Sequence, residues 1–226
     1  MSFILQTLTH VTITNMSSAQ KTVLFIFIGI VAIGLMYVVA RGLNKNSTSS
    51  PSDTVSSSSS TSSSSTMTNP SKKYTFPGVL PVDQITNKKI TLHTDKGDII
   101  FDLYEKDAPK TVSNFVYLAT EKFYDGLTFH RYVPGFVIQG GDPTGNGTGG
   151  PGYKFEDEKV TKKYTKGIVA MANSGPNTNG SQFFIMLADT PLPPQYTIFG
   201  NVTSGMDVVE KLREGDVMKT VAVSNK

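Results

Sequence analysis

A tract of serine and threonine divides the chain and limits where a folded domain can lie. From residue 47 to residue 66, 17 of the 20 residues are Ser or Thr. Such a segment buries too little apolar area to offset the conformational entropy that ordering it would cost. We therefore expect a disordered Ser/Thr-rich linker over residues 41–71 and a folded domain over residues 72–226. These 155 residues are enough to bury a hydrophobic core.

An apolar run precedes the tract. Residues 22–40 contain no charge over 19 positions and are bounded by Lys21 and Arg41. A helix needs about 20 apolar residues to cross a bilayer, whereas the core of a signal peptide has about 7–15. We therefore favour a transmembrane helix acting as a signal anchor, with residues 1–21 as an N-terminal head. A cleaved signal peptide is the alternative, because Val38 and Ala40 offer a small-residue cleavage site.

The orientation of this helix is not decided by positive charges, because Lys21 lies on one side and Arg41 and Lys45 lie on the other. The Ser/Thr-rich composition predicts a flexible tether. Tethers of this kind are common on extracytoplasmic domains. We therefore expect a single-pass membrane protein whose folded domain lies outside the cytoplasm.

The folded part begins with a hairpin. Residues 89–94 and 98–103 alternate between apolar and polar side chains, which predicts two strands. The intervening Asp95-Lys96-Gly97 predicts a turn with glycine in the left-handed conformation. A helix should follow, with Asp107 as its cap and Pro109 in its first turn. Its expected apolar stripe is Val112, Phe115, Val116 and Ala119.

A second helix is predicted near the C-terminus. Ser204 and Asp207 have the spacing of a capping box, and Gly215 is expected to end the helix. The residues expected to face the core are Val208, Val209 and Leu212. Two helices among many short strands favour a mainly β fold, with helices covering the ends of a closed barrel.

Composition excludes several classes of site. The chain has no cysteine, which removes disulfides, thiolate metal sites and cysteine nucleophiles. Its net charge is +3 and no basic block exceeds a Lys-Lys pair, so we expect no nucleic-acid partner. His10, His93 and His130 lack metal-ligand spacing, so we expect no metal site.

Two further patterns have simple structural explanations. Residues 145–150 match G-x-G-x-x-G, but Pro151 and Gly152 follow where a dinucleotide site needs a helix, so we predict a loop. Residues 156–158 are acidic and lie near lysines, which indicates a solvated surface. The sequence contains no G-x-S-x-G motif, which would have indicated a hydrolase.

Two segments have the composition of an apolar pocket with few polar groups. Residues 129–142 read FHRYVPGFVIQGGD, and residues 171–184 read MANSGPNTNGSQFF. Ordinary core packing could explain Phe136 and Phe184, because aromatic residues on strands are usually buried. Arg131 beside them favours a binding site, because a buried guanidinium needs acceptors and a ligand carbonyl can be one.

These segments resemble the cyclophilins, the cyclosporin-binding family of peptidyl-prolyl cis–trans isomerases, over about Lys89 to Ala222. The resemblance implies a closed eight-stranded antiparallel β-barrel with two capping α-helices. It implies isomerisation of X–Pro bonds in folding proteins without a cofactor or covalent intermediate, with Arg131 as the catalytic residue. It implies that substrate is bound by His130, Phe136, Val137, Gln139, Ala172, Asn173, Gln182, Phe184, Leu192 and Tyr196.

The sequence departs from the family pattern at the rim of the implied pocket. Val137 stands where many members have methionine. The segment 190–196 is about one residue shorter than in common eukaryotic members. It brings Leu192 near the position of the tryptophan that favours cyclosporin, and Tyr196 near the usual histidine. We therefore expect isomerase activity with weak cyclosporin binding.

The expected partners follow from the same resemblance. They are proline-containing polypeptide clients and, through residues 22–40, a membrane; we expect a monomer. The alternative function is a non-catalytic module that binds proline-containing peptides while tethered to the membrane. The presence of Arg131, Phe136, Gln139 and Phe184 favours the enzyme.

Overall fold

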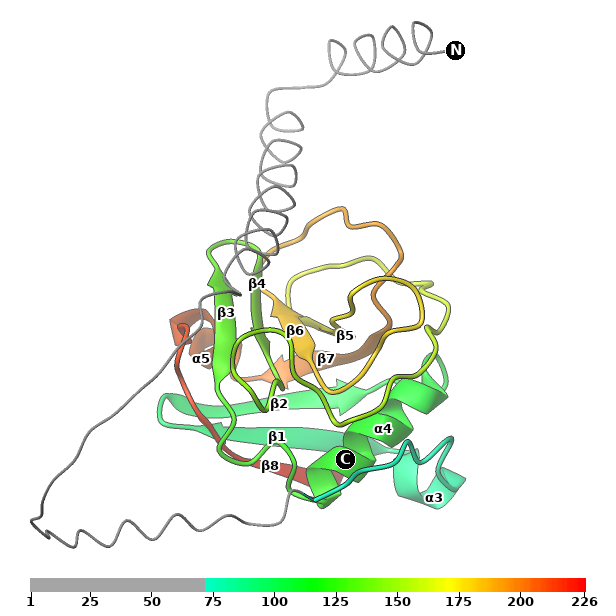
Figure 1. Ribbon diagram of the computed structural model, residues 1–226. Coiled ribbons are helices and arrows are strands. Elements are labelled where there is room, and N and C mark those ends of the chain that lie inside the picture. The colour runs from blue at the N-terminus through cyan, green and yellow to red at the C-terminus, as the bar shows by residue number, and fades with distance from the viewer. Residues whose placement is uncertain (1–71) are drawn as a thin grey trace, which may run out of the picture. The chain divides into compact units, whose positions relative to one another are not determined.

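Alternating and apolar segments of the domain form eight strands and three helices (Figure 1). The computed structural model describes residues 72–226, so the predicted head, transmembrane helix and linker lie outside the described residues. In order, the elements are α3 (Val82–Ile85), β1 (Lys88–Thr94), β2 (Gly97–Leu103), α4 (Pro109–Thr120), β3 (Phe129–Val133), β4 (Val137–Gly140), β5 (Ile168–Met171), β6 (Phe183–Met186), β7 (Ile198–Ser204), α5 (Met206–Lys211) and β8 (Met218–Asn225). Over residues 72–226, helices are too short or too polar to cross a membrane.

The strands form one curled antiparallel sheet in the order β3-β4-β6-β5-β7-β2-β1-β8. This confirms the mainly β fold and the eight antiparallel strands. The edge strands β3 and β8 are linked by an isolated bridge between Thr128 and Val217 rather than by a full ladder. The Phe129 N–H also donates to the Asp216 carbonyl (2.8 Å). The sheet is therefore a half-barrel whose edges meet over a short length, rather than the closed barrel that the resemblance implied.

The predicted hairpin between β1 and β2 is confirmed. Thr94 pairs with Gly97, and Gly97 has φ +128°, which only glycine adopts without strain. A Cβ at this position would lie 2.9 Å from a methyl group of Val208. Glycine is therefore required both by the turn and by the approach of α5.

The first predicted helix is confirmed as α4, and its expected stripe of four apolar residues is buried. The expected cap is wrong. Ala108 occupies the N-cap without a side-chain bond, and Asp107 pairs instead with Lys162 (3.2 Å). The Glu158 carboxylate accepts hydrogen bonds from the N–H groups of Lys110 (2.9 Å) and Thr111 (2.8 Å). A residue remote in sequence thus satisfies the helix N-terminus, where a negative charge is favourable.

The second predicted helix is α5, whose expected inward residues Val208, Val209 and Leu212 are buried. The predicted capping box is wrong, because Gly205 is the N-cap, with φ +82°, and no side chain makes a capping hydrogen bond. The helix ends at Lys211, before the predicted Gly215, since Leu212 is already extended. The following turn is held by the Arg213 N–H, which donates to the Asp216 carboxylate (2.6 Å).

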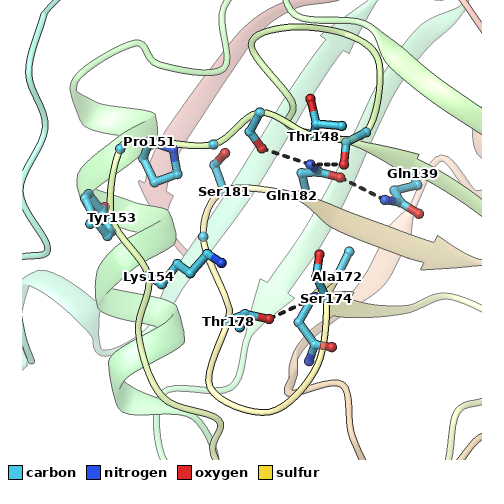
Figure 2. A pocket seen from close by; sticks show the side chains of 16 residues that line it. Gln139, Thr148, Pro151, Tyr153, Lys154, Ala172, Ser174, Thr178, Ser181 and Gln182 are labelled. Carbon is cyan, nitrogen blue, oxygen red and sulfur yellow. Dashed lines mark hydrogen bonds between the residues drawn. The ribbon is translucent and has the colours of Figure 1, made fainter. Parts of the chain in front are cut away.

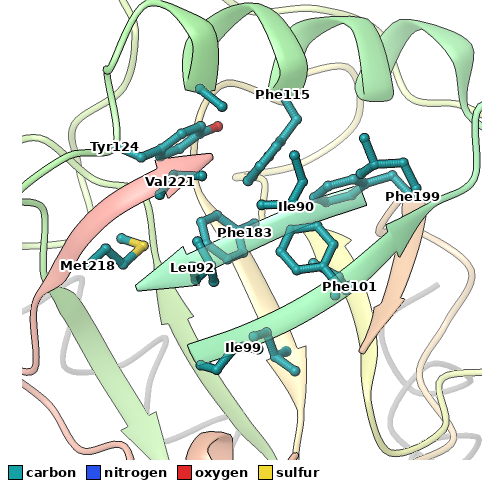
Figure 3. Packing of buried hydrophobic residues seen from close by; sticks show 14 of the residues in the cluster. Ile90, Leu92, Ile99, Phe101, Phe115, Tyr124, Phe183, Phe199, Met218 and Val221 are labelled. Carbon is teal, nitrogen blue, oxygen red and sulfur yellow. The ribbon is translucent and has the colours of Figure 1, made fainter. Parts of the chain in front are cut away.

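Two apolar clusters lie on opposite faces of the central strands. The interior cluster packs the concave face of the sheet against α4 (Figure 3). In it, Phe115 of α4 stacks on Tyr124 (ring centroids 4.7 Å apart) and meets Phe183 of β6 edge-on (5.3 Å). We call the second group the outer cluster; its buried members are Val137, Tyr164, Ile168, Ala170, Phe184, Met186 and Ile198. Strands β5 and β6 are buried along their whole length because they contribute to both clusters.

Candidate active site

Register places the predicted arginine beside the outer cluster. Arg131 of β3 pairs with Gln139 of β4, Gln139 pairs with Phe184 of β6, and Phe184 pairs with Ala170 of β5. Residues paired directly across antiparallel strands point to the same face. Arg131, Gln139 and Phe184 therefore form a row across the outer face, which confirms that these distant segments come together.

A chain of hydrogen bonds orients the guanidinium. Arg131 Nη1 donates to Gln139 Oε1 (3.1 Å), and Gln139 Nε2 donates to Gln182 Oε1 (3.0 Å). Gln182 Nε2 then donates to the carbonyls of Gly147 (3.1 Å) and Gly149 (2.9 Å), as Figure 2 shows in part. We call this chain the amide relay. It uses one of the five guanidinium N–H groups, so Arg131 is held in place yet keeps donors for a ligand.

The loop at the far end of the amide relay is held in place by a buried carboxylate. Asp142 is 1% exposed and accepts bonds from the N–H groups of Thr144 (2.7 Å), Asn146 (3.1 Å) and Gly147 (2.5 Å), and from the Thr144 hydroxyl (2.8 Å). Burial opposes ionisation, but these donors outweigh it and hold the pKa of Asp142 below its usual value. The carboxylate thereby fixes the loop whose carbonyls receive Gln182.

An apolar wall stands beside the arginine. Val137 and Phe184 are buried in the outer cluster, and Phe136, Leu192 and Tyr196 pack against it half-buried. The rings of Tyr196 and Phe184 meet edge-on with centroids 5.6 Å apart. The five predicted pocket residues are therefore brought together, with a half-buried rim that a small apolar ring could cover.

Asn173 and Ala172 lie where β5 ends. Asn173 Nδ2 donates to the Gln195 carbonyl (2.8 Å), and Ala172 N–H donates to the Gln182 carbonyl (2.9 Å). Among residues 72–226, the main-chain N–H and C=O of Asn173 have no backbone partner. The side chain of Asn173 is thus committed to the protein, and its main chain can meet an extended peptide.

His130 occupies a bulge in the β3–β4 ladder, between the paired residues Phe129 and Arg131. Its two ring nitrogens are buried and have no hydrogen-bond partner within the described domain. Burial lowers the pKa of His130, and the positive charge of Arg131 lowers it further against the opposing effect of Asp142. The imidazole is therefore neutral at pH 7 and adds no second positive charge beside Arg131.

A cavity of about 820 Å³ adjoins Gln139 and Gln182 (Figure 2). The predicted loop is confirmed at residues 145–150, and its residues 147–150 line one side of this cavity. Other lining residues are Tyr153, Lys154, Ser174, Thr178 and Ser181. Sequence reasoning missed this cavity, because glycines carry no side chain that indicates chemistry.

The acidic segment 156–158 was expected to be solvated surface, and for two of its residues this is wrong. Glu156 is exposed and pairs with Lys110 (3.2 Å). Asp157 binds the Asn177 N–H (2.8 Å) and Asn179 Nδ2 (2.7 Å), and Glu158 caps α4.

In the part of the chain that is described, no three metal-ligating side chains gather in one place.

The domain matches known proteins over nearly its whole length. A family model described as cyclophilin type peptidyl-prolyl cis-trans isomerase/CLD matches residues 89–226. A peptidyl-prolyl cis-trans isomerase of Helicobacter pylori is 47% identical over 140 residues, covering 60% of this chain and 86% of that protein. Peptidyl-prolyl cis-trans isomerase B of Bacillus subtilis is 52% identical over 132 residues, covering 57% of this chain and 92% of that protein.

Solved structures agree with the sequence comparison. A cyclophilin type peptidyl-prolyl cis-trans isomerase of Cryptosporidium parvum superposes with a TM-score of 0.57 at 35% identity, covering 62% of this chain and 98% of that one. The Cryptosporidium protein has also been crystallised in the presence of the dipeptide Ala-Pro. The chain therefore belongs to the family of cyclophilin-type peptidyl-prolyl cis–trans isomerases and is itself such an isomerase.

Proposed function

We propose that Arg131 is the catalytic residue and that it acts by stabilising a twisted amide. Resonance gives the peptide bond a rotational barrier of about 18–20 kcal/mol, and X–Pro bonds exchange over tens to hundreds of seconds without help. Rotation removes the resonance and localises a lone pair on the prolyl nitrogen. A guanidinium donor directed at that nitrogen and at the prolyl carbonyl stabilises this state, with no nucleophile or cofactor required.

The observation that carries this proposal is the row of Arg131, Gln139 and Phe184 across three strands, next to the apolar wall. The wall receives the proline ring and excludes water, which strengthens the bond from Arg131. The free main chain of Asn173 holds the neighbouring peptide, and the cavity beside Gln182 accepts a nearby client side chain. The Ala-Pro dipeptide used with the Cryptosporidium relative supports clients that contain proline.

Removal of the arginine tests this role, and the domain offers a matched control. Arg213 has its guanidinium against an aromatic ring, 4.6 Å from the Tyr132 centroid, and it donates to carbonyls near the end of α5. We expect Arg131→Ala to lower kcat/KM by about 100-fold or more, as loss of one transition-state donor does elsewhere. Arg213→Ala should retain activity. Exchange NMR on an X–Pro peptide measures both.

Equal exchange rates for the wild type and Arg131→Ala would contradict the catalytic role of Arg131. Peptide binding that survives in Arg131→Ala while turnover disappears would support that role, because the apolar wall remains intact.

We also propose that residues 22–40 anchor the protein and that the isomerase domain assists protein folding outside the cytoplasm. The uncharged run and the Ser/Thr-rich tract support this arrangement. Protease added to intact cells should digest the domain, with a cytoplasmic protein as the protected control. Protection of the domain from a protease that cuts it after lysis would contradict this topology.

Two narrower proposals concern partners. We propose that the domain is a monomer, and analytical ultracentrifugation of the purified domain tests this. The half-buried Leu192 in the wall supports weak cyclosporin binding, because leucine offers less area than the family's tryptophan. Sub-micromolar inhibition of the purified domain would contradict it.

A further inference from the structure

Segment 190–196 provides part of the apolar wall, yet it has few groups with which to hold its own backbone. Pro191, Pro193 and Pro194 have no N–H group, so four amide donors remain among its seven residues. Two of these four donate to one residue outside the segment, Tyr164. The Thr190 N–H donates to the Tyr164 carbonyl (3.0 Å), and the Tyr196 N–H donates to the Tyr164 hydroxyl (3.0 Å).

The hydroxyl of Tyr164 makes a second bond to the same residue. It donates to the Tyr196 carbonyl (2.9 Å), so both main-chain polar groups of Tyr196 are satisfied by one oxygen atom. Tyr164 is 5% exposed and belongs to the outer cluster, so its ring has a fixed position. Burial raises the pKa of Tyr164, which keeps the hydroxyl protonated and able to donate.

The groups that Tyr164 holds in this way face the proposed substrate site. The Tyr196 ring packs edge-on against Phe184 (5.6 Å), and Leu192 lies between the two anchored ends. The carbonyl of Gln195, next to Tyr196, accepts the bond from Asn173 Nδ2 (2.8 Å). The position of segment 190–196 therefore sets both the apolar wall and the side chain of Asn173.

We propose that Tyr164 is a positioning residue for substrate binding, which clamps both ends of segment 190–196 and so fixes the wall that receives the proline ring. This inference rests on the proposed function of that wall. Tyr164 is buried against the segment and is not among the proposed substrate contacts. Loss of its hydroxyl should therefore weaken binding of the peptide and leave the action of Arg131 on bound peptide nearly unchanged.

The variant Tyr164→Phe keeps the buried ring and the main-chain bond to Thr190, and it removes both hydroxyl bonds to Tyr196. Tyr124→Phe is the matched control: its hydroxyl is also buried and donates to a carbonyl, that of Ser181 (3.3 Å), but its ring lies in the interior cluster. For both variants and the wild type we would measure the melting temperature, KM and kcat by exchange NMR, the Kd of an X–Pro peptide, and hydrogen exchange at the Tyr196 amide.

For Tyr164→Phe we expect KM and Kd to rise about tenfold and kcat to stay within about twofold, because a buried donor and acceptor lose their partner. Exchange of the Tyr196 amide should accelerate in this variant alone. Tyr124→Phe should lower the melting temperature with KM within about twofold of the wild type. Unchanged KM and amide exchange in Tyr164→Phe would overturn the proposal, as would an unprotected Tyr196 amide in the wild type.

The same measurements separate this inference from the proposed function. If the wild type showed no turnover, the catalytic role of Arg131 would fail. The role of Tyr164 would then be decided by Kd and amide exchange, which do not depend on turnover.

Discussion

The buried carboxylate of Asp142 offers a direct test of how the arginine is held. Its four hydrogen bonds come from three N–H groups and one hydroxyl, all of which act as donors toward its two oxygens. Asp142→Asn keeps the shape but replaces one oxygen with an NH₂ group. Each oxygen accepts two of the four bonds, so the change turns two favourable contacts into donor–donor contacts.

The expected loss of stability follows from these two contacts. A hydrogen bond to a charged group contributes ~1.5–3 kcal/mol, so Asp142→Asn should lower the free energy of unfolding by about 3 kcal/mol. For a domain of this length, that corresponds to a melting temperature lower by roughly 6–12 °C. Urea denaturation followed by circular dichroism measures the change.

The pH dependence of folding stability provides an independent test of the same prediction. The pKa of Asp142 is lowered in the folded domain, so its stabilising contribution is present above the unfolded value of about 3.9. That contribution is lost as the pH falls through the lower, folded value. The stability difference between the wild type and Asp142→Asn should therefore be constant near pH 6 and shrink below about pH 4. A difference that does not change between these pH values would refute the reasoning.

The functional consequence depends on the amide relay. Displacement of the Gly147 and Gly149 carbonyls should release Gln182, and through Gln139 it should loosen Arg131. We expect kcat/KM to fall about tenfold at a temperature where both proteins are folded, which equals ~1.4 kcal/mol of transition-state stabilisation. Full activity in a destabilised Asp142→Asn variant would show that Arg131 does not need the relay.

Three further predictions use neighbouring residues as controls. Gly149→Ala should be less stable than the wild type, because its Cβ would lie 2.1 Å from a carboxylate oxygen of Asp142. In the control Gly150→Ala the new Cβ meets nothing within 4 Å, so this variant should melt like the wild type. Glu158→Ala should lower the free energy of unfolding by about 2 kcal/mol in urea denaturation through loss of the two α4 bonds, while the exposed Glu156→Ala should not. Between pH 7 and pH 9, kcat/KM should be flat in exchange NMR, because the pKa of His130 is lowered and an arginine stays charged; a bell-shaped profile would indicate proton transfer.

Two motif-bearing segments and their resemblance to the cyclophilins allowed Arg131, Gln139 and Phe184 to be predicted as site residues. Each lies in a short strand, and antiparallel pairing brings the three side chains to one face. Reasoning from local sequence failed at helix ends. It assigned caps to Asp107 and Ser204, the nearest suitable side chains, but Glu158 and Gly205 fill those roles. Helix stripes reflect repeated burial over several turns, whereas a cap is one interaction that a tertiary contact can replace.

Sequence reasoning predicted the loop at residues 145–150 and placed Leu192 and Tyr196 at the site, but it could not show what the backbone of these two segments does, and the reason is physical. Segment 145–150 acts through its carbonyl groups, and segment 190–196 acts through a backbone that Tyr164 must hold. Every residue has a carbonyl, so composition cannot show which ones will be directed at a site. In this domain Arg131, Gln139 and Phe184 lie on the sheet, while main-chain groups of loops support the proposed site. Substitutions in those loops should therefore change the geometry of the site even where no side chain faces the substrate.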